Sequence, residues 1–509
     1  MNLKNNFSWL LIIIISVGLW TWLEASPTLG DPDAFYHAGI STLMNDHLVL
    51  ADFPWLDQTL LKDRFTDQHF LYHVLLVMLN KLFTPLISVK IATVIGCALF
   101  ITFIYLFLRE KKVKSAWLYI GLLLITAPFI VRLAIPKATP WALLCLFLGM
   151  YFWERKKPLA LFGITFIYVW LHGGFILLPI SAFIFWIVQN IFNYVKKEKN
   201  NFIAWQKWFA LSGGLISGLI INPYFPSNIF FYWQQIVNIG LINYKNAVDV
   251  GAEWYGYSLP DFIGGTSLLW LLIISAIIMA VFIRHEQKVN NYQWGFLAII
   301  FFIATLKSRR YVEYFVPIAL IWSALEINLF LTTNASTKFI QYLKIQYQKH
   351  NTKIKILVVY LFIAILSSVV ISLRDAKQYM VNSMRQDQFL AAGKYLQEHT
   401  PRGSLVFHTS WDDWPMLFYY APNNYFLVGM DPTFMYKKDL VKYKLWRDIS
   451  DGKIKSSLAE IISREFSCRY MIIDKTDEDS KLFWAYLIRD KNIKVIYNDE
   501  EVIIYEIQQ

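Results

Sequence analysis

An acidic motif near the start of the chain has the residue types and spacing of a reactive site. It reads Gly30-Asp31-Pro32-Asp33-Ala34-Phe35-Tyr36-His37 and begins seven residues after an apolar run that ends near Leu23. Ionised side chains beside a membrane are costly unless they are paired, hydrated or bound to a ligand, so they mark functional candidates. Pro32 favours an extended conformation here, and residues two apart in an extended segment project to the same side. The spacing therefore predicts that Asp31 and Asp33 face one ligand.

That ligand is either a divalent cation or a proton that one carboxylate accepts. Carboxylate oxygens favour hard cations, so Mg²⁺ or Mn²⁺ held by Asp31, Asp33 and His37 is the expected metal site, in preference to zinc bound through His37. Paired carboxylates equally serve as a catalytic base without any metal. The motif leaves both alternatives open.

A second acid and a cationic turn occur later in the chain. Glu253 lies in Gly251-Ala252-Glu253-Trp254-Tyr255-Gly256-Tyr257, where it either reaches a cavity as a catalytic acid or base, or anchors its loop to a basic partner. Arg309 and Arg310 occupy a short turn between two apolar runs. Guanidinium groups bind phosphate in a bidentate manner, so we expect these arginines to bind a lipid-linked phosphate. Contact with lipid headgroups is the alternative.

Arg132 and Lys137 form a second cationic pair with the same two interpretations. Near the C-terminus, two indoles frame two carboxylates in Ser410-Trp411-Asp412-Asp413-Trp414-Pro415. Rings that pack on a ligand and acids that accept its hydrogen bonds are typical of a binding loop. We therefore expect Trp411, Asp412, Asp413 and Trp414 to bind an acceptor, the alternative being a core tryptophan beside a capping aspartate.

Composition indicates a polytopic membrane protein. The 509 residues are 56% hydrophobic and 17% aromatic, which is too apolar for a soluble chain. The net charge of +11 comes from short basic clusters between apolar runs. The positive-inside rule accounts for such clusters, so nucleic-acid binding is not expected. Three cysteines, two of them inside apolar runs, exclude a disulfide framework.

A membrane span needs about 20 apolar residues in a helix, and the sequence offers eleven candidates. They are 7–23, 87–108, 115–131, 140–153, 159–171, 175–195, 206–222, 262–283, 292–306, 312–330 and 354–372. Threading them with a cytoplasmic N-terminus places five basic clusters in the cytoplasm. The loops 24–86 and 223–261 and the tail after 372 then lie outside. The apolar run 69–83 would invert the later loops if it spanned, so we expect an interfacial helix there.

From about residue 373, charged residues alternate with shorter apolar runs. The pattern predicts strands at 405–408, 425–429 and 470–474, helices at 387–399 and within 437–465, and a hairpin from 493 to 507. The expected fold is a polytopic α-helical membrane domain with about eleven spans, residues 1–372, followed by a soluble extracytoplasmic α/β domain, residues 373–509.

This organisation resembles that of the GT-C glycosyltransferases, and within them the catalytic subunits of oligosaccharyltransferases. Asp31-Pro32-Asp33-Ala34-Phe35-Tyr36-His37 is similar to their first-loop motif. Ala391 to Pro401, followed by Ser404 to Trp414, is similar to the approach to their Trp-Trp-Asp-Tyr-Gly motif. The chain departs from the family in two places. Ser410, Asp413 and Trp414 stand where Trp, Tyr and Gly are expected, and the second outer loop offers Arg132 and Lys137 in place of an acidic pair.

The resemblance implies transfer of a sugar or oligosaccharide from a polyprenyl-phosphate or -diphosphate donor, with an outer-loop aspartate as base or metal ligand. The departures leave the acceptor open among a glycan, a lipid and a protein. The alternative function is a non-enzymatic flippase or transporter of lipid-linked glycans. Transport predicts ionisable residues near the middle of several spans, whereas here the charges gather at the span ends.

Overall fold

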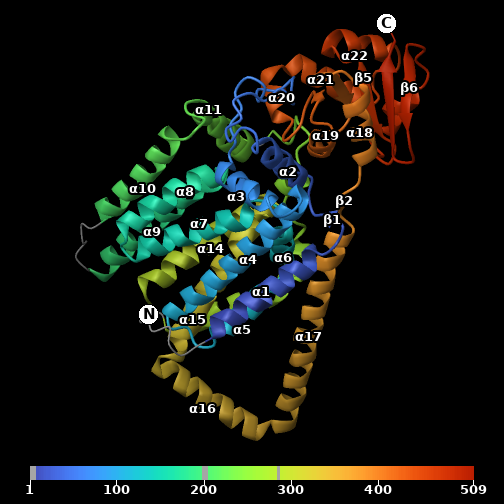
Figure 1. Cartoon of the computed structure of the whole chain (residues 1–509). Coiled ribbons are helices and arrows are strands. Elements are labelled where there is room, and N and C mark those ends of the chain that lie inside the picture. Colours follow the sequence, from blue (N-terminus) through green and yellow to red (C-terminus); the bar gives the residue numbers. More distant parts are fainter. Residues whose placement is uncertain (1–6, 198–203, 243, 284–286, 509) are drawn as a thin grey trace.

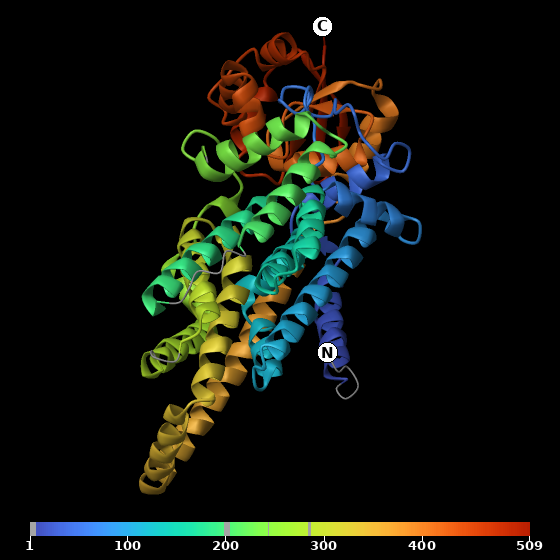
Figure 2. The ribbon, with the colours of Figure 1, turned by 90° about the vertical axis from the view of Figure 1, so that its left-hand side faces the viewer.

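The computed structural model describes residues 7–197, 204–242, 244–283 and 287–508. Most of the chain forms a bundle of helices, and a domain with a five-stranded sheet covers one end of the bundle (Figures 1 and 2). We call this end of the bundle the sheet end. The amphipathic helix α16 (Asn334–Lys349) lies at the opposite end (Figure 1).

The bundle region consists of α1 (Ser8–Glu24), β1 (Thr28–Leu29), α2 (Asp33–Leu43), α3 (Phe70–Asn80), α4 (Pro85–Glu110), α5 (Ala116–Leu123), α6 (Ala127–Ala134), α7 (Thr139–Glu154), α8 (Pro158–Leu171), η2 (Gly173–Ile176), α9 (Leu177–Lys196), α10 (Ala204–Ile220), α11 (Ser227–Trp233), η3 (Gln234–Ile242), η4 (Ala252–Trp254), α12 (Leu259–Gly265), α13 (Ser267–Phe282), α14 (Val289–Lys307), η5 (Arg309–Tyr311), α15 (Val312–Leu331), α16 and α17 (Asn351–Val381). The expected interfacial run 69–83 corresponds to α3.

Apolar helices support an integral membrane protein. In the described part of the chain, five are long and apolar enough to cross a membrane, namely α4, η2 with α9, α14, η5 with α15, and α17. The number rises to seven if each of two bent helix pairs is one span. The helices α1, α3 and α8 are apolar but shorter. The expected number of eleven spans is therefore not confirmed.

Two of the expected spans are broken rather than straight. The run 115–131 divides into α5 and α6, which meet at 71°, and the run 262–283 divides into α12 and α13, which meet at 81°. Pro128 lies in the first turn of α6, where a residue without an amide hydrogen begins a helix but cannot continue one. The second helix of this pair, α6, is short and carries Arg132 in its last turn.

The C-terminal region folds around a mixed sheet with the strand order β4-β3-β5-β7-β6. The strands β3, β4 and β5 are parallel, and β5, β7 and β6 are antiparallel neighbours. The predicted strands 405–408 and 470–474 and the terminal hairpin are confirmed. The elements are β2 (Met384–Arg385), α18 (Leu390–His399), β3 (Leu405–His408), η6 (Trp411–Asp413), α19 (Trp414–Tyr420), β4 (Tyr425–Phe426), α20 (Thr433–Lys438), α21 (Leu440–Ser450), α22 (Leu458–Phe466), β5 (Tyr470–Asp474), α23 (Lys481–Leu487), β6 (Ile493–Asn498) and β7 (Val502–Ile507).

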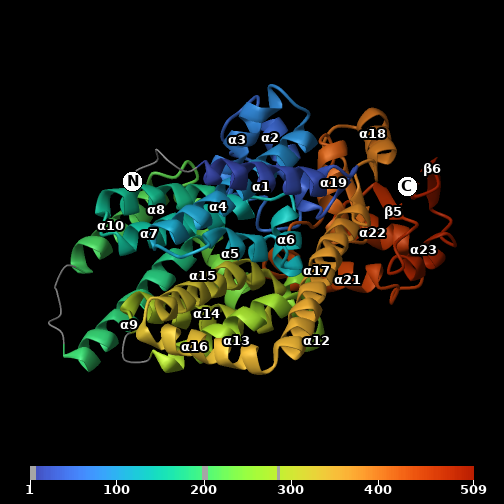
Figure 3. The same ribbon diagram turned by 90° about the horizontal axis from the view of Figure 1, so that it is seen from below.

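Helix α17 connects the two regions and continues to Val381, past the expected boundary at 372. Its sheet end contacts α6 and α1, and most of its apolar side chains are exposed at the edge of the bundle (Figure 3). β1 pairs with β2, so the segment that leads into α2 is tied to the C-terminal region. The loop between α2 and α3 also reaches the sheet, since the Asp57 amide donates to the Phe426 carbonyl.

Helix α2 packs directly on α19 at Gly39. A Cβ at this position would lie 2.6 Å and 2.9 Å from two ring carbons of Phe418. That ring is buried and stacked on Trp414, with the ring centroids 5.0 Å apart, so it has little room to move. The Gly39→Ala variant is expected to lose about 1–3 kcal/mol of stability through overpacking, measured as a lower midpoint of thermal unfolding in detergent.

The matched control for this variant is Gly18→Ala, because a Cβ at Gly18 meets no atom within 4 Å. Alanine favours a helix over glycine, so this control is expected to be neutral or slightly stabilising. Equal midpoints for the two variants would contradict the close approach of α2 and α19.

Candidate active site

Asp31 and Asp33 face one partner, Lys137. The Lys137 ammonium lies 2.9 Å from Asp31 Oδ2 and 2.8 Å from Asp33 Oδ2. Lys137 follows the broken helix α6, so residues about one hundred positions apart meet at the sheet end of the bundle. The prediction was that the two carboxylates face one ligand. In the structure, the Lys137 ammonium occupies the position between them.

The extended conformation expected for this motif is wrong. Pro32 has φ −61° and ψ −26°, and Asp33 is the first residue of α2. The Asp33 amide donates a hydrogen bond of 2.9 Å to Asp31 Oδ1, and an acid in the first turn is favoured by the helix dipole. The two carboxylates therefore share a partner because a helix begins between them.

The environment of Asp31 makes it a stronger proton acceptor than an ordinary aspartate. Burial raises the pKa of Asp31 to about 6, although Lys137 opposes this rise, while Asp33 and Glu253 contribute to it. The Asp31 side chain is 23% exposed and that of Asp33 is 43% exposed. A catalytic base works best with a pKa near the working pH, so Asp31 is the better candidate.

Glu253 holds two arginines together at the same end of the bundle. Its carboxylate lies 2.8 Å from Arg132 Nη1 and 3.6 Å from Arg310 Nη2. Burial raises the pKa of Glu253, but Arg310, Lys137 and Arg132 outweigh it and hold this pKa well below its usual range. A carboxylate that is so strongly favoured as an anion is a poor base. The geometry therefore favours the alternative of an anchor to basic partners.

Sequence reasoning missed Glu313, which completes this network. Its carboxylate lies 3.1 Å from Arg132 Nη2, and its side chain is only 4% exposed. Glu313 lies in the first turn of α15. The signal in the sequence was an acid at the edge of the apolar run 312–330, since intramembrane carboxylates are rare unless they are paired.

The turn that carries Arg309 and Arg310 packs on the loop that carries Glu253. The Arg309 amide donates to the Tyr255 carbonyl, and Ser308 Oγ donates to the Glu253 carbonyl. The Arg310 guanidinium lies 4.4 Å from the centroid of the Trp254 ring. The side chain of Arg310 is 29% exposed and its ion pair with Glu253 is long, so it retains capacity for an anionic ligand.

Arg309 differs from Arg310 in its contacts. Its Nε donates to the Gly256 carbonyl at 3.2 Å, and its guanidinium lies over the Tyr257 ring. These contacts direct Arg309 away from Glu253. The structure therefore places Arg132 and Arg310 in one network with Glu253 and leaves Arg309 beside it.

The turn at Trp411 to Trp414 divides into exposed and buried members. Trp414 is fully buried, and its indole donates to the Trp55 carbonyl, so it has no surface with which to contact a ligand. Trp411 is half-buried and Asp412 is exposed. The Trp411 ring lies beside Gly251, where a Cβ would be 3.7 Å away, so η6 adjoins the loop of Glu253.

The two carboxylates of this turn lie in different surroundings. Loss of solvent around its carboxyl group raises the pKa of Asp412 to about 7, although the residue as a whole keeps exposed surface, and repulsion from Asp31 and Asp33 adds to this rise. Burial also raises the pKa of Asp413 well above its usual value, helped by Asp474 and Asp477. The charges of Asp31 and Asp33 therefore act on Asp412, whereas Asp413 is affected by carboxylates at and after the end of β5.

The expected metal ligands Asp31, Asp33 and His37 are not brought together. In the part of the chain that the structure describes, one group of three or more potential ligands lies close enough to hold a metal ion, and it consists of His37, His69 and His73. The Lys137 ammonium pairs with both aspartates, and His37 Nδ1 lies 2.7 Å from His73 Nε2. The set chosen from the sequence therefore does not fit Mg²⁺ or Mn²⁺.

The arrangement combines a candidate base with a cluster of cations. Asp31 and Asp33 pair with Lys137, and Asp412 lies within electrostatic range of all three. Arg132 and Arg310 lie beside Glu253. Lys137 connects the two groups, because its charge acts on both Asp31 and Glu253. Such a site can accept a proton from one ligand and stabilise negative charge on another.

Comparisons with known proteins place this geometry in a known fold. Neither a protein-family model nor a curated protein sequence matches the chain. The solved structures that resemble it include the apo form of the oligosaccharyltransferase of Archaeoglobus fulgidus, at 13% identity and a TM-score of 0.64, with 93% of this chain and 70% of that chain covered. The same archaeal protein has also been solved in complex with Zn and sulfate.

Two further solved structures share the architecture. The arabinofuranosyltransferase AftD from Mycobacteria is 12% identical with a TM-score of 0.56, and the alignment covers 98% of this chain and 40% of that chain. ArnT from Cupriavidus metallidurans, solved bound to undecaprenyl phosphate, is 14% identical with a TM-score of 0.53, and 97% of each chain is covered. At these identities the likeness concerns the fold.

Proposed function

Because the chain has the fold of GT-C glycosyltransferases, we propose that it transfers a sugar or oligosaccharide from a polyprenyl-phosphate or -diphosphate donor to an acceptor on the extracytoplasmic face. One observation carries the proposal: a carboxylate with a raised pKa and a cluster of cations converge at one end of an apolar helical bundle. Fold alone does not give function, so these side chains carry the proposal.

The proposed reaction assigns a role to each group. Asp31 accepts the proton of the acceptor hydroxyl or amide as the acceptor atom bonds to the anomeric carbon of the sugar. The bond from that carbon to the phosphate oxygen breaks, and the negative charge stays on the lipid phosphate. Arg310 and Arg132 stabilise this charge, while Glu253 positions the two guanidiniums.

Lys137 supplies a positive charge where the sequence suggested a metal ion. Its ammonium contacts Asp31 and Asp33, and the electrostatic attraction of both carboxylates raises the pKa of Lys137 above its usual value against the effect of burial. Asp31 and Asp33 direct carboxylate oxygens at this ammonium, so they do not form a ligand set for Mg²⁺ or Mn²⁺. The proposed mechanism uses protein cations and a carboxylate base.

An open apolar cavity of about 670 Å³ lies between α13, α14 and α15. Its lining includes Trp270, Phe302 and Phe315, and these rings contact Phe262, which stacks on Tyr257. Tyr257 in turn lies under the Arg309 guanidinium. We place the polyprenyl chain in this cavity and its phosphate at the turn that carries Arg309 and Arg310. In this position the apolar chain contacts apolar side chains while the phosphate contacts cations.

The acceptor is assigned to the C-terminal turn. Asp412 lies within electrostatic range of Asp31, and Trp411 adjoins the loop of Glu253, so these two residues are the proposed contacts. Trp414 and the more deeply placed Asp413 support this turn from beneath. We propose that residues 373–509 form the extracytoplasmic acceptor-binding part, with the N-terminus in the cytoplasm. Cysteine labelling that finds residue 197 accessible only from the cytoplasm would support this orientation, and access only from outside would overturn it.

Two experiments test this function. In the first, a sugar-labelled polyprenyl donor is supplied to the detergent-solubilised protein. In the second, the surface glycans and lipid-linked precursors of a deletion strain are compared with those of its parent. A transferase moves label without a membrane, whereas a flippase or transporter cannot. Loss of the protein is expected to remove a surface glycan and to accumulate its lipid-linked precursor. Unchanged glycans and precursors in the deletion strain, together with no transfer in detergent, would contradict the proposal.

The pH dependence of transfer reports on the proposed base. Asp31 must be deprotonated to accept a proton, so kcat/KM is expected to fall as the pH drops through about 6, the pKa of Asp31. Lys137 lowers this pKa, so the Lys137→Met variant is expected to shift the acid limb to higher pH by about 1–3 units. The measurement is kcat/KM of each protein across the pH range.

Lys81→Met provides the matched control, because Lys81 is an exposed lysine at the end of α3. Its acid limb is expected to coincide with that of the wild type. An acid limb in Lys137→Met at the wild-type position would show that Asp31 is not the titrating base.

A further inference from the structure

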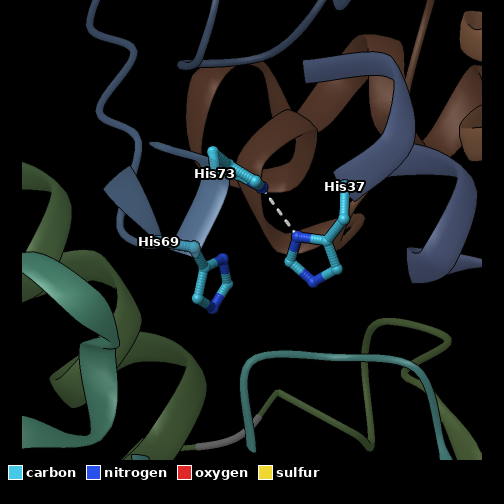
Figure 4. Close-up of side chains that lie close together, drawn as sticks. All are labelled: His37, His69 and His73. Carbon is cyan, nitrogen blue, oxygen red and sulfur yellow. Dashed lines mark hydrogen bonds between the residues drawn. The ribbon is translucent and has the colours of Figure 1, made fainter. Parts of the chain in front are cut away.

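Three histidines meet beneath the loop that joins α2 and α3. His37 lies in α2, His69 directly precedes α3, and His73 lies in its first turn. Each offers a ring nitrogen, and these nitrogens lie within 4.8 Å of one another. Figure 4 shows the three rings turned toward a common space, with the His37 and His73 rings joined by a hydrogen bond of 2.7 Å. His37 and His73 are fully or almost fully buried.

Asp67 orients this cluster from outside it. Its Oδ2 lies 2.7 Å from His73 Nδ1, and its Oδ1 accepts from the His69 amide at 2.9 Å. Because a carboxylate only accepts, His73 Nδ1 must donate, which leaves the lone pair of His73 Nε2 directed at His37. A carboxylate that fixes the outer nitrogen of a histidine in this way is characteristic of metal-binding histidines.

His69 provides a second, independent observation. Its Nδ1 is buried and, among the described residues, has no hydrogen-bond partner. A buried polar atom without a partner costs free energy, so its position calls for a ligand.

We propose that His37, His69 and His73 bind one Zn²⁺ ion. Three imidazoles suit zinc and similar borderline metals, whereas Mg²⁺ and Mn²⁺ favour oxygen ligands. Zn–N bonds of about 2.0–2.1 Å require ligand nitrogens roughly 3.3 Å apart, which small rotations of rings within 4.8 Å can reach. The ion replaces the proton that His37 and His73 share, and its fourth position remains for water or another oxygen ligand.

The proposed ion would fix α2 against α3. His37 lies one helical turn after Asp33, so holding His37 also sets the direction in which Asp33 meets Lys137. The three histidines are positioning residues in this proposal, and zinc binding does not depend on the chemistry proposed above.

Zinc binding is tested on the purified full-length protein in detergent, stripped with a chelator and titrated with Zn²⁺. We expect one equivalent to bind and raise the midpoint of thermal unfolding, and Co²⁺ in place of zinc to give the visible absorption of a low-coordinate site. Wild-type protein that binds no stoichiometric zinc and gives no such absorption with Co²⁺ would overturn the proposal without any need for a variant.

Variants then locate the ion. His69→Ala and His73→Ala are expected to abolish stoichiometric binding, and Asp67→Asn to weaken it by about 10–100-fold while the stoichiometry persists. His47→Ala is the matched control, since His47 is exposed in the same loop. Wild-type zinc affinity in folded His69→Ala and His73→Ala proteins, or loss of zinc in His47→Ala, would place the ion elsewhere and refute this site.

Discussion

Replacing Asp31 with asparagine is expected to lower kcat for sugar transfer by about 10²–10⁴-fold, the range for loss of a general base. Asparagine keeps the shape of the side chain and can still accept the hydrogen bond from the Asp33 amide. It cannot take the proton of the acceptor. The start of α2 should therefore remain intact while chemistry slows, and transfer of a labelled sugar from a polyprenyl donor at saturating substrate measures the change.

Two further variants separate the base from its surroundings. Asp33→Asn is expected to have a smaller effect on kcat, and it should move the acid limb to lower pH, because Asp33 raises the pKa of Asp31. Asp52→Asn changes an exposed aspartate of the same loop and is expected to leave transfer unchanged. If Asp31→Asn retained wild-type kcat, Asp31 would not be the base.

Secondary structure was predictable where the pattern is local and the element is short. The strands β3 and β5 coincide with the predicted runs because each run is too short for a typical helix and contains β-branched and aromatic residues, which favour a strand. The straight spans expected at 115–131 and 262–283 failed. An apolar run predicts burial in a membrane equally well whether the helix is continuous or broken, so hydropathy does not reveal the bends.

The Asp31 motif shows a limit of local rules. The restriction that proline imposes on its predecessor concerns Asp31 alone, whereas Pro32 and Asp33 begin a helix. Proline is well suited to a helix start, and the acid in the first turn adds to this preference. The same residues thus satisfy two local patterns, and packing of α2 against α19 favours the helical one.

The contacts between the candidate site residues were less predictable than the residues themselves. The sequence identified Asp31, Glu253, Arg132 and Arg310 as unusual charges, but it could not show that Glu253 pairs with arginines from two different segments. Nor could it show that His69 and His73 join His37, because the loop that brings them together spans more than twenty residues. Contacts of this kind depend on the tertiary fold, whereas residue type depends on the sequence alone.

Replacing Arg310 with methionine is expected to lower kcat/KM for the lipid-linked donor by about 10²–10³-fold, as for removal of one preorganised group that stabilises developing charge. Arg310 is preferred to Arg132 for this test. Arg132 is 11% exposed and pairs with both Glu253 and Glu313, so its loss would remove the ion pair of the buried Glu313, leave Glu253 with only its long contact to Arg310, and endanger folding. Arg310 is more exposed and has one long ion pair, so methionine can pack on Trp254 in its place.

Arg310→Lys refines the assignment, because lysine keeps the charge but loses the planar, bidentate geometry. Its kcat/KM should lie between those of the wild type and Arg310→Met if phosphate is the ligand. Arg374→Met, at an exposed arginine paired with Asp375, is the matched control and should transfer sugar at the wild-type rate. The Arg310→Met variant contains no other change that compensates for the lost charge. A wild-type kcat/KM for the polyprenyl donor in this variant would therefore show that Arg310 does not bind the leaving phosphate.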